Sequence, residues 1–144
     1  IREGITAETL AALRPAFEKL GAMGFDATAM RRYPQVEKID HLHHAGNSSG
    51  IVDGASMMLI GSRAKGLELG LKARAKFRAV AIACTEPTIM LEGPKPATEK
   101  ALQKAGLTIK DIDLFEVNEA FAVVPLKYQR ELENDPELDR KSGV

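Results

Sequence analysis

Residues 111–122 read Asp-Ile-Asp-Leu-Phe-Glu-Val-Asn-Glu-Ala-Phe-Ala, and this stretch decides the fold that we expect. Residues 113–117 predict a β-strand, and residues 119–132 predict a helix directly after it. Pro125 conflicts with that helix unless its ring falls in the first turn or marks a kink, because proline lacks a backbone donor. The face that we expect to point inward carries Phe121, Val124, Tyr128 and Leu132.

The same alternation of strand and helix precedes this stretch. Residues 77–84 (Phe-Arg-Ala-Val-Ala-Ile-Ala-Cys) predict a strand of small apolar side chains, the kind that is buried on both faces of a sheet. Residues 97–105 predict a helix, and Gly106 stands where a glycine ends many helices. Strand, helix, strand, helix favours a right-handed crossover and a parallel strand pair. Since no third strand follows, we expect an α/β fold with helices packed on an incomplete mixed sheet.

The first half of the chain is less regular. Thr6 is a suitable N-cap for a helix that Pro15 should break. Residues 25–40 show no clear pattern and predict a connection or insertion on the surface. Residues 57–60 (Met-Met-Leu-Ile) predict a short buried strand, and residues 63–71 predict an exposed helix with a charged face.

Composition excludes several classes of protein. The 144 residues carry 20 Lys and Arg against 20 Asp and Glu, and this balance, with few aromatic residues, argues against nucleic-acid binding. No apolar run approaches the roughly 18 residues that span a bilayer. The single cysteine excludes an internal disulfide framework and a thiolate metal cluster. We therefore expect a soluble, cytoplasmic protein with no membrane span and no nucleic-acid partner.

Asn118 follows a predicted parallel strand, at the sheet edge where α/β proteins bind ligands. A carboxamide there can donate a hydrogen bond to an oxyanion, directly or through a water, without titrating. On position alone, a cap for a helix that begins at Glu119 is the favoured interpretation. Residues 45–54 are similarly open to two interpretations. Their small, polar character suits close approach of an amide-bearing cofactor arm, or a helix cap and turn built around Ser49 or Asp53.

Five other residues suggest chemistry but have simpler explanations. His41, His43 and His44 invite a metal-site hypothesis, yet no further ligands join them at a suitable spacing, so we expect no metal. Cys84 ends an apolar strand and lacks a neighbouring base, which is typical of an inert cysteine. Met90, between a strand and a helix, can wall an acyl pocket or simply fill a core.

Three stretches in this order resemble the thiolase family of acyl-CoA acyltransferases. They are residues 45–55 (Ala-Gly-Asn-Ser-Ser-Gly-Ile-Val-Asp-Gly-Ala), residues 93–102 (Gly-Pro-Lys-Pro-Ala leading into Lys-Ala-Leu), and residues 111–122 with Asn-Glu-Ala-Phe, one of four catalytic-site motifs of the family. The resemblance covers about residues 3–132. It implies a partial thiolase-like fold in which residues 1–44 end the loop region with a longer, atypical connection at 18–44. Residues 45–75 would then end the N-terminal core domain, and residues 76–144 would open the C-terminal one.

The resemblance also implies site residues. Asn118 would anchor the catalytic water of the first oxyanion hole, which stabilises the enolate of the acetyl thioester. Ala45 and Ser49 would line the pantetheine arm of coenzyme A. Met90 would border the acyl pocket, with Ala120 and Phe121 at the catalytic cavity. Coenzyme A and acyl-CoA would be substrates, with no permanently bound cofactor. Because ketoacyl synthases carry histidine at the position of Asn118, and sterol-carrier-type thiolases lack Asn-Glu-Ala-Phe, an ordinary thiolase is favoured.

The implied reaction is thiolytic cleavage of a 3-ketoacyl-CoA, or the reverse condensation of two acetyl-CoA molecules. Family members use a nucleophilic cysteine, a Gly-His-Pro histidine and a second cysteine, and Cys84 matches neither cysteine. We therefore expect an internal thiolase fragment that is inactive alone. The complete enzyme would be a homo-oligomer, a dimer or tetramer, with a trifunctional-complex α-chain as a further candidate partner.

Two other classes of function remain open. One is a non-catalytic acyl-CoA or lipid-binding module, which would bind coenzyme A without acyl transfer. The other is an assembly piece of a trifunctional-complex β-chain, for which residues 18–44 would form the contact.

Overall fold

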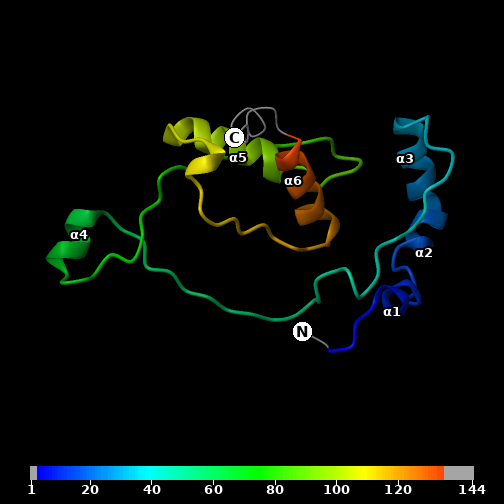
Figure 1. Ribbon diagram of the computed structural model, residues 1–144, viewed down its shortest axis with the longest axis horizontal. Helices are drawn as coiled ribbons and strands as arrows, with labels where there is room; N and C mark the ends of the chain where they lie inside the picture. The colour runs from blue at the N-terminus through cyan, green and yellow to red at the C-terminus, as the bar shows by residue number, and fades with distance from the viewer. Residues whose placement is uncertain (1–2, 135–144) are drawn as a thin grey trace, which may run out of the picture.

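A computed structural model describes residues 3–134. Helices α1 to α3 lie at one end, α4 at the other, and α5 and α6 along one side, with long irregular segments between them (Figure 1). No helix in this described range is both long and apolar enough to cross a membrane. The helical elements are α1 (Ala7–Ala11), α2 (Glu18–Leu20), the π-helical turn η1 (Gly21–Phe25), α3 (Asp26–Arg32), α4 (Arg63–Glu68), α5 (Pro94–Ala105), the 3-10 turn η2 (Ile109–Asp111) and α6 (Val123–Glu133).

Local sequence signals set the ends of several helices. The Thr6 hydroxyl accepts from the Thr9 backbone N–H at 3.3 Å and caps α1, as predicted. That helix ends at Ala11, before Pro15, which confirms the predicted break. Gly106 ends α5 with a φ of 65°, the left-handed conformation that glycine adopts at little cost, and this too confirms the prediction.

Helix α6 begins at Val123, four residues later than predicted. Pro125 therefore falls in the first turn, where its missing N–H is not needed, so the conflict with a helix disappears. Val124 and Tyr128 are the buried apolar residues of the described chain, at 7% and 5% exposure. The Tyr128 hydroxyl lies 3.0 Å from the Thr98 hydroxyl of α5, and its ring lies 6.1 Å from that of Phe115. A small core thus joins α5, α6 and the segment before α6.

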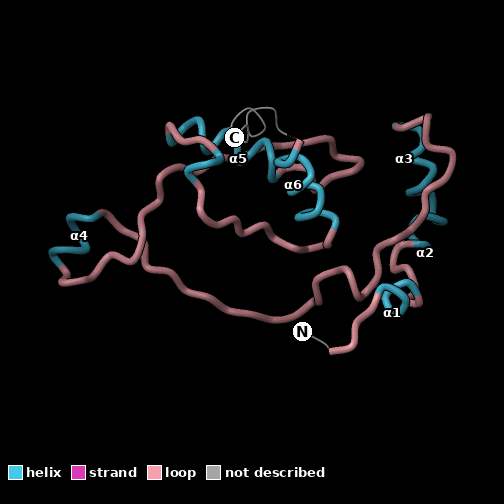
Figure 2. Tube along the Cα trace, viewed as in Figure 1, coloured by secondary structure: helices cyan, strands magenta, loops and turns pink. Residues whose placement is uncertain are grey.

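The predicted sheet does not form among residues 3–134. Neither residues 77–84 nor residues 113–117 are strands, and the described chain has one isolated antiparallel bridge instead (Figure 2). A strand needs a neighbour that satisfies its backbone groups. Here the carbonyls of Val80 and Ile82 accept hydrogen bonds from the lysines of α5: Lys104 Nζ at 3.0 Å and Lys100 Nζ at 3.1 Å. Side-chain ammonium groups therefore occupy acceptors that a neighbouring strand would use.

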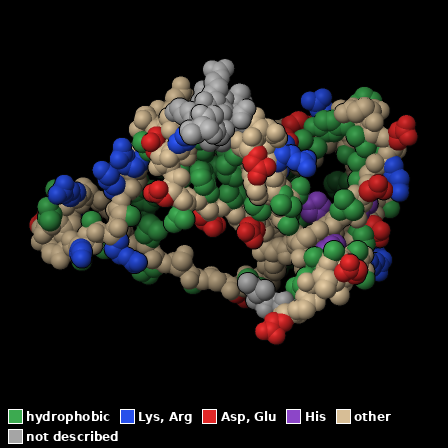
Figure 3. Space-filling model, viewed as in Figure 1, with side chains coloured by type: hydrophobic (Ala, Val, Ile, Leu, Met, Phe, Trp, Pro, Cys, Tyr) green, Lys and Arg blue, Asp and Glu red, His purple; other side chains and the backbone are tan. Residues whose placement is uncertain are grey.

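The prediction that residues 57–60 are buried is also wrong. Met57 is 100% exposed, and the other three side chains of this run are exposed as well. Residues 50–60 run apart from α5 and α6, with open space between them (Figures 1 and 3). Burial requires a second apolar surface to pack against, and the described residues place none beside this run.

Residues 18–32 are more regular than predicted. Elements α2, η1 and α3 follow one another without a break, bent at Gly24, whose φ is 111°. The Thr28 hydroxyl donates to the Gly24 carbonyl at 3.1 Å across the bend. The expected irregular connection over residues 25–40 is therefore wrong for Asp26–Arg32, because its Ala, Met and Arg residues favour helix. Helix α3 has no buried residue, so the expected surface position is confirmed.

Candidate functional site

A short antiparallel contact joins residues 47–49 to residues 120–122. Ser48 and Phe121 form the isolated bridge. The Ser49 N–H donates to the Ala120 carbonyl, and the Ala122 N–H donates to the Asn47 carbonyl, both at 2.9 Å. Two segments that are more than 70 residues apart in the sequence are thus fixed side by side. The contact brings three of the predicted site residues together: Ser49, Ala120 and Phe121.

Asn47 holds the turn that carries Ala45 toward this contact. Its carboxamide oxygen accepts from the His44 backbone N–H at 2.8 Å, and its Nδ2 donates to the Leu42 carbonyl at 2.8 Å. A Cβ at Gly46 would lie 2.5 Å from the end of the Leu10 side chain, which would have to shift to admit a larger residue. We assigned no role to Asn47 from the sequence, although an asparagine in a small, polar stretch is typical of such turns.

Asn118 lies in the irregular segment between η2 and α6, and its side chain is exposed. Helix α6 starts at Val123 after Ala122, with no side-chain cap, so Asn118 does not cap it. The interpretation as a helix cap at Glu119 is therefore wrong. Among residues 3–134, no group forms a hydrogen bond with the Asn118 carboxamide, which leaves both its N–H and its oxygen able to meet a ligand or water.

A surface hollow of about 290 Å³ lies beside this segment, along α6. Val117 and Glu119 contribute to it, but Asn118 between them does not. It is lined by Phe115, Glu116, Val117, Glu119, Pro125, Tyr128, Gln129 and Leu132. The hollow is thus mostly apolar with two carboxylates, and it lies next to the candidate catalytic amide without including it.

An aromatic cluster fixes the Phe121 side chain. Its ring meets that of His43 edge-on at a centroid distance of 4.8 Å, and Phe17 lies 6.0 Å from both rings. Edge-to-face pairs of this kind are favourable because the positive ring edge meets a negative face. The Ala16 N–H donates to the His43 carbonyl at 2.8 Å and ties the cluster to the N-terminal region. Phe121 is therefore held rigidly beside Ala120.

The three histidines have three separate partners. His41 Nε2 lies 3.0 Å from Asp26 Oδ2, His43 packs in the aromatic cluster, and His44 Nδ1 accepts from the Gly46 N–H at 3.1 Å. Within residues 3–134, no three His, Cys, Asp or Glu side chains gather in a way that could hold a metal ion.

Met90 belongs to a tight turn and not to the contact described above. Its N–H donates to the Glu86 carbonyl at 3.0 Å, and its side chain is 59% exposed. Met90 and Leu91 have φ values of 48° and 60°, which are rare for residues other than glycine. No hydrogen bond or ring contact within the described chain connects Met90 to Asn118 or Ser49.

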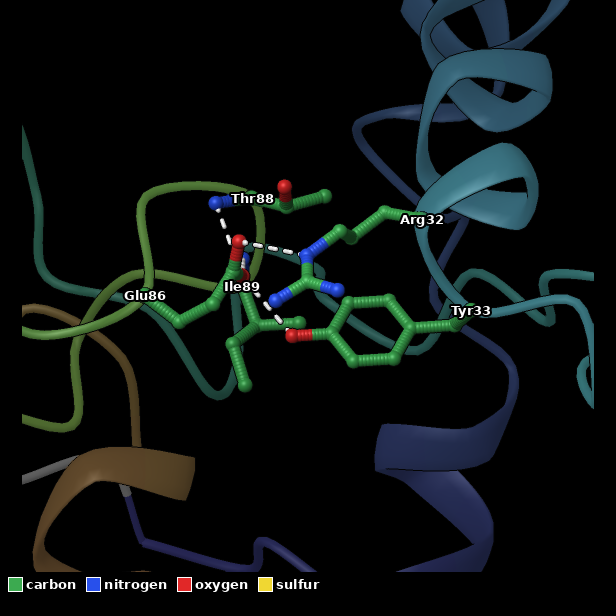
Figure 4. Close-up of polar contacts among 5 residues, drawn as sticks. All are labelled: Arg32, Tyr33, Glu86, Thr88 and Ile89. Atoms are coloured by element: carbon green, nitrogen blue, oxygen red, sulfur yellow. Dashed lines mark hydrogen bonds and ion pairs between the residues drawn. The ribbon is translucent and has the colours of Figure 1, made fainter.

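Glu86, at the start of this turn, gathers four donors (Figure 4). The Tyr33 hydroxyl donates to it at 2.7 Å and Arg32 Nε at 3.4 Å, while the backbone N–H groups of Thr88 and Ile89 donate at 2.9 and 3.1 Å. Partial burial opposes the charge, but the hydrogen bonds outweigh it and lower the Glu86 pKa from 4.5 to about 2. The sequence had no signal for this cluster, because Arg32 and Tyr33 lie more than 50 residues from Glu86.

Comparisons with known proteins bear on the whole arrangement. A family model described as the thiolase C-terminal domain matches residues 71–143. The chain is 44% identical over 140 residues to a 3-ketoacyl-CoA thiolase of Colwellia psychrerythraea, covering 97% of this chain and 31% of that protein. It is 48% identical over 132 residues to the one of Aliivibrio salmonicida, covering 92% of this chain and 29% of that protein.

Solved structures agree with these relatives. The Bacillus anthracis acetyl-CoA acetyltransferase matches with a TM-score of 0.71 and 37% identity, covering 94% of this chain and 29% of that one. The human mitochondrial 3-ketoacyl-CoA thiolase matches with a TM-score of 0.70 and 35% identity over the same shares. The chain thus spans about a third of the length of the curated relatives it matches.

Proposed function

Since the chain belongs to the thiolase family, we propose that it is part of an enzyme that transfers acyl groups between thioesters and coenzyme A. The reaction is thiolytic cleavage of a 3-ketoacyl-CoA or the reverse condensation of two acetyl-CoA molecules. The four proteins named above support this assignment, three as 3-ketoacyl-CoA thiolases and one as an acetyl-CoA acetyltransferase. Coenzyme A and acyl-CoA act as substrates, and no permanently bound cofactor takes part.

Asn118 is the residue that we assign to the chemistry. In the proposed reaction its carboxamide holds a water that donates a hydrogen bond to the thioester oxygen, where negative charge develops as the enolate forms. A neutral, fixed donor stabilises that charge without losing a proton itself. One observation carries the assignment: the carboxamide is exposed, does not cap α6, and lies two residues from the fixed contact at Ala120.

We assign Ala45 and Ser49 to the pantetheine arm of coenzyme A, with Ala120 and Phe121 at the catalytic cavity. The antiparallel contact at Ser48 and Phe121 supports this grouping, because it holds the two segments side by side. The aromatic cluster around Phe121 adds rigidity, which a site that positions a thioester needs. Met90 is assigned to the border of the acyl pocket.

We further propose that the 144 residues alone do not turn over. Covalent acyl transfer needs a thiolate nucleophile with a base, and the one cysteine of the sequence, Cys84, is exposed. The nearest carboxylate in the sequence, Glu86, is already occupied by Tyr33 and Arg32. The match of residues 71–143 to a C-terminal domain supports a boundary near residue 75 between two core domains. In the complete enzyme we propose a homo-oligomer.

The decisive experiment compares Asn118→Ala with wild type in the protein made from the complete reading frame. We expect kcat for thiolysis to fall about 100-fold or more, the usual cost of losing one oxyanion-hole donor, with KM for coenzyme A little changed. Gln103→Ala is the matched control, since it removes an exposed carboxamide from α5, away from this segment. A full-rate Asn118→Ala enzyme, or a wild-type protein without thiolysis, would overturn the proposal.

A second candidate, an assembly surface on residues 18–44, is favoured by one observation. Met23 and Phe25 of η1 are largely exposed, although neither belongs to an unsupported segment. Large apolar side chains exposed on a helical surface are typical of contacts with a partner chain. Replacing both by serine should prevent oligomer formation while coenzyme A binding persists. An unchanged sedimentation coefficient would exclude this surface as the contact.

A further inference from the structure

The turn from Glu86 to Glu92 has an unusual backbone. Met90 and Leu91 are consecutive residues with φ values of 48° and 60°. Side chains other than glycine meet steric resistance in this region, so such a conformation persists only where surrounding contacts fix it. Any function of this turn therefore depends on the contacts that fix its backbone.

Ionic contacts hold the turn at both ends. At its start, Glu86 accepts from Tyr33 at 2.7 Å and from Arg32 at 3.4 Å. At its end, Glu92 lies 2.9 Å from Lys127 of α6, which also pairs with Glu131 at 2.9 Å. Within the turn, the Glu86 carboxylate also accepts the backbone N–H groups that precede Met90, at 2.9 and 3.1 Å. The turn is thus tied to α3 on one side and to α6 on the other.

The contact with α3 comes from residues 18–44, the stretch for which the resemblance to thiolases implies a longer connection. Arg32 ends α3, and Tyr33 follows it. The other ion pairs of residues 18–44 are internal: His41 with Asp26, and Lys38 with Asp40 at 2.9 Å. Among the described ion pairs, the link to Glu86 is therefore the one by which this stretch reaches another part of the molecule.

We propose that Arg32, Tyr33 and Glu86 act as a clamp that sets the position of Met90, and with it the acyl-chain length that the enzyme accepts. This inference rests on the proposed function, in which Met90 borders the acyl pocket. The three clamp residues are positioning residues, because they would act through Met90 and not touch the substrate. The long stretch between residues 18 and 44 thereby becomes a determinant of specificity.

At physiological pH Glu86 is a carboxylate, and this charge state favours the hydrogen bonds that hold the turn. A carboxylate accepts more hydrogen bonds than a carboxylic acid, and Glu86 uses that capacity for four donors. The same interaction raises the Tyr33 pKa, because the neutral hydroxyl is the form that donates to Glu86. Hydrogen bonds with an ionised partner are stronger than neutral ones, which suits a device that must hold a strained turn.

The test uses Tyr33→Phe in the protein made from the complete reading frame, with two readouts. The first is amide hydrogen exchange at Thr88 and Ile89, which we expect to quicken about 10-fold when the clamp loses one charge-assisted bond. The second is kcat/KM for a four-carbon and a ten-carbon 3-ketoacyl-CoA, whose ratio we expect to change about fivefold. Glu86→Gln removes the charge that strengthens all four hydrogen bonds and leaves one acceptor oxygen, so it should give larger changes in both.

The matched control is Lys38→Ala, which removes an exposed ion pair from the same stretch and should leave both readouts unchanged. Wild-type protein without thiolysis would overturn the proposed function, and with it the specificity role. Active wild type with an unchanged substrate ratio in Tyr33→Phe would overturn the clamp alone. Faster exchange together with a changed ratio supports it. Arg32→Gln gives an independent route if Tyr33→Phe does not fold.

Discussion

Residues 86–134 and residues 50–82 belong to the same chain but differ sharply in how their side chains are placed. In the first region α5 and α6 bury Val124 and Tyr128, and ion pairs such as Glu92 with Lys127 join separate elements. In the second region Met57 is fully exposed, and neighbouring apolar side chains are exposed as well. A helix satisfies its own backbone groups, whereas a strand depends on neighbours. The first region therefore packs on its own helices, whereas the second, apart from α4, consists of segments without such partners.

The largest effect should come from the small core of the first region. Tyr128→Ala removes a side chain that is 5% exposed, with its ring contact to Phe115 and its hydrogen bond to Thr98. We expect the free energy of unfolding to fall by about 3 kcal/mol, as for other large-to-small changes in cores. Urea unfolding followed by far-UV circular dichroism measures this. Met57→Ala, in the second region, should change it by less than about 0.5 kcal/mol, and equal losses would contradict the comparison.

Substitutions at two glycines test how backbone conformation at α5 and α4 affects the stability of the chain. Gly106→Ala places a side chain at a φ of 65° and should destabilise the chain by about 1 kcal/mol. Gly66 lies inside α4, where a Cβ would have no atom within 4 Å, so Gly66→Ala should stabilise it by roughly 0.5–1 kcal/mol. Thermal unfolding of both variants gives the two signs directly. Shifts of the same sign would show that backbone conformation does not control these positions.

The Glu86 clamp predicts a pH dependence. Its hydrogen bonds lower the folded-state pKa from 4.5 to about 2, so the folded chain binds its proton less readily than the unfolded chain does. The stabilisation is then complete above pH 4.5 and is lost as the pH falls toward 2. Unfolding free energies between pH 6 and 2 should show this decline, and Glu86→Gln should remove that part of it. A decline of equal size in Glu86→Gln would assign the effect to other carboxylates.

Helix ends could be predicted because the relevant interactions lie within a few residues. Thr6, Pro15 and Gly106 act on their own turns, and each has the predicted effect. The sheet could not be predicted in the same way, since each strand depends on partners elsewhere. The run of small apolar side chains predicted residues 77–84 as a strand, but lysines of α5 donate to the carbonyls of Val80 and Ile82. Local sequence patterns thus predicted the conformation correctly only where contacts within a few residues determine it.

The candidate site also contains features that local sequence patterns indicate and contacts between distant segments that they do not. The motif around Asn118 indicated the segment, yet position alone favoured a cap for a helix beginning at Glu119. The start of α6 at Val123 excludes that alternative. The contact of Ser49 with Ala120 joins segments about 70 residues apart, so no local pattern could indicate it. Tyr33 and Glu86 are 53 residues apart and carry no sequence signal of their meeting. The sequence therefore indicated candidate site residues, but not which distant residues lie beside them in the structure.

The smallest effect on the unfolding free energy should come from substitutions at Val80 and Ile82, in the second region. These substitutions should instead alter self-association. Val80 and Ile82 are exposed, while their carbonyls accept from Lys104 and Lys100, and a side-chain substitution leaves those carbonyls in place. Val80→Lys with Ile82→Lys should therefore change the unfolding free energy by less than about 0.5 kcal/mol.

The same two substitutions should reduce self-association of the 144-residue chain. Exposed apolar side chains favour contact between copies, and added lysines oppose it through charge repulsion. Sedimentation velocity over a concentration series measures the association. Leu102→Lys is the matched control, because Leu102 is half-buried on α5, and this change should lower the unfolding free energy. Equal destabilisation by both sets of lysines would mean that residues 80–82 already pack against the rest of the chain, and the contrast between the two regions would then be lost.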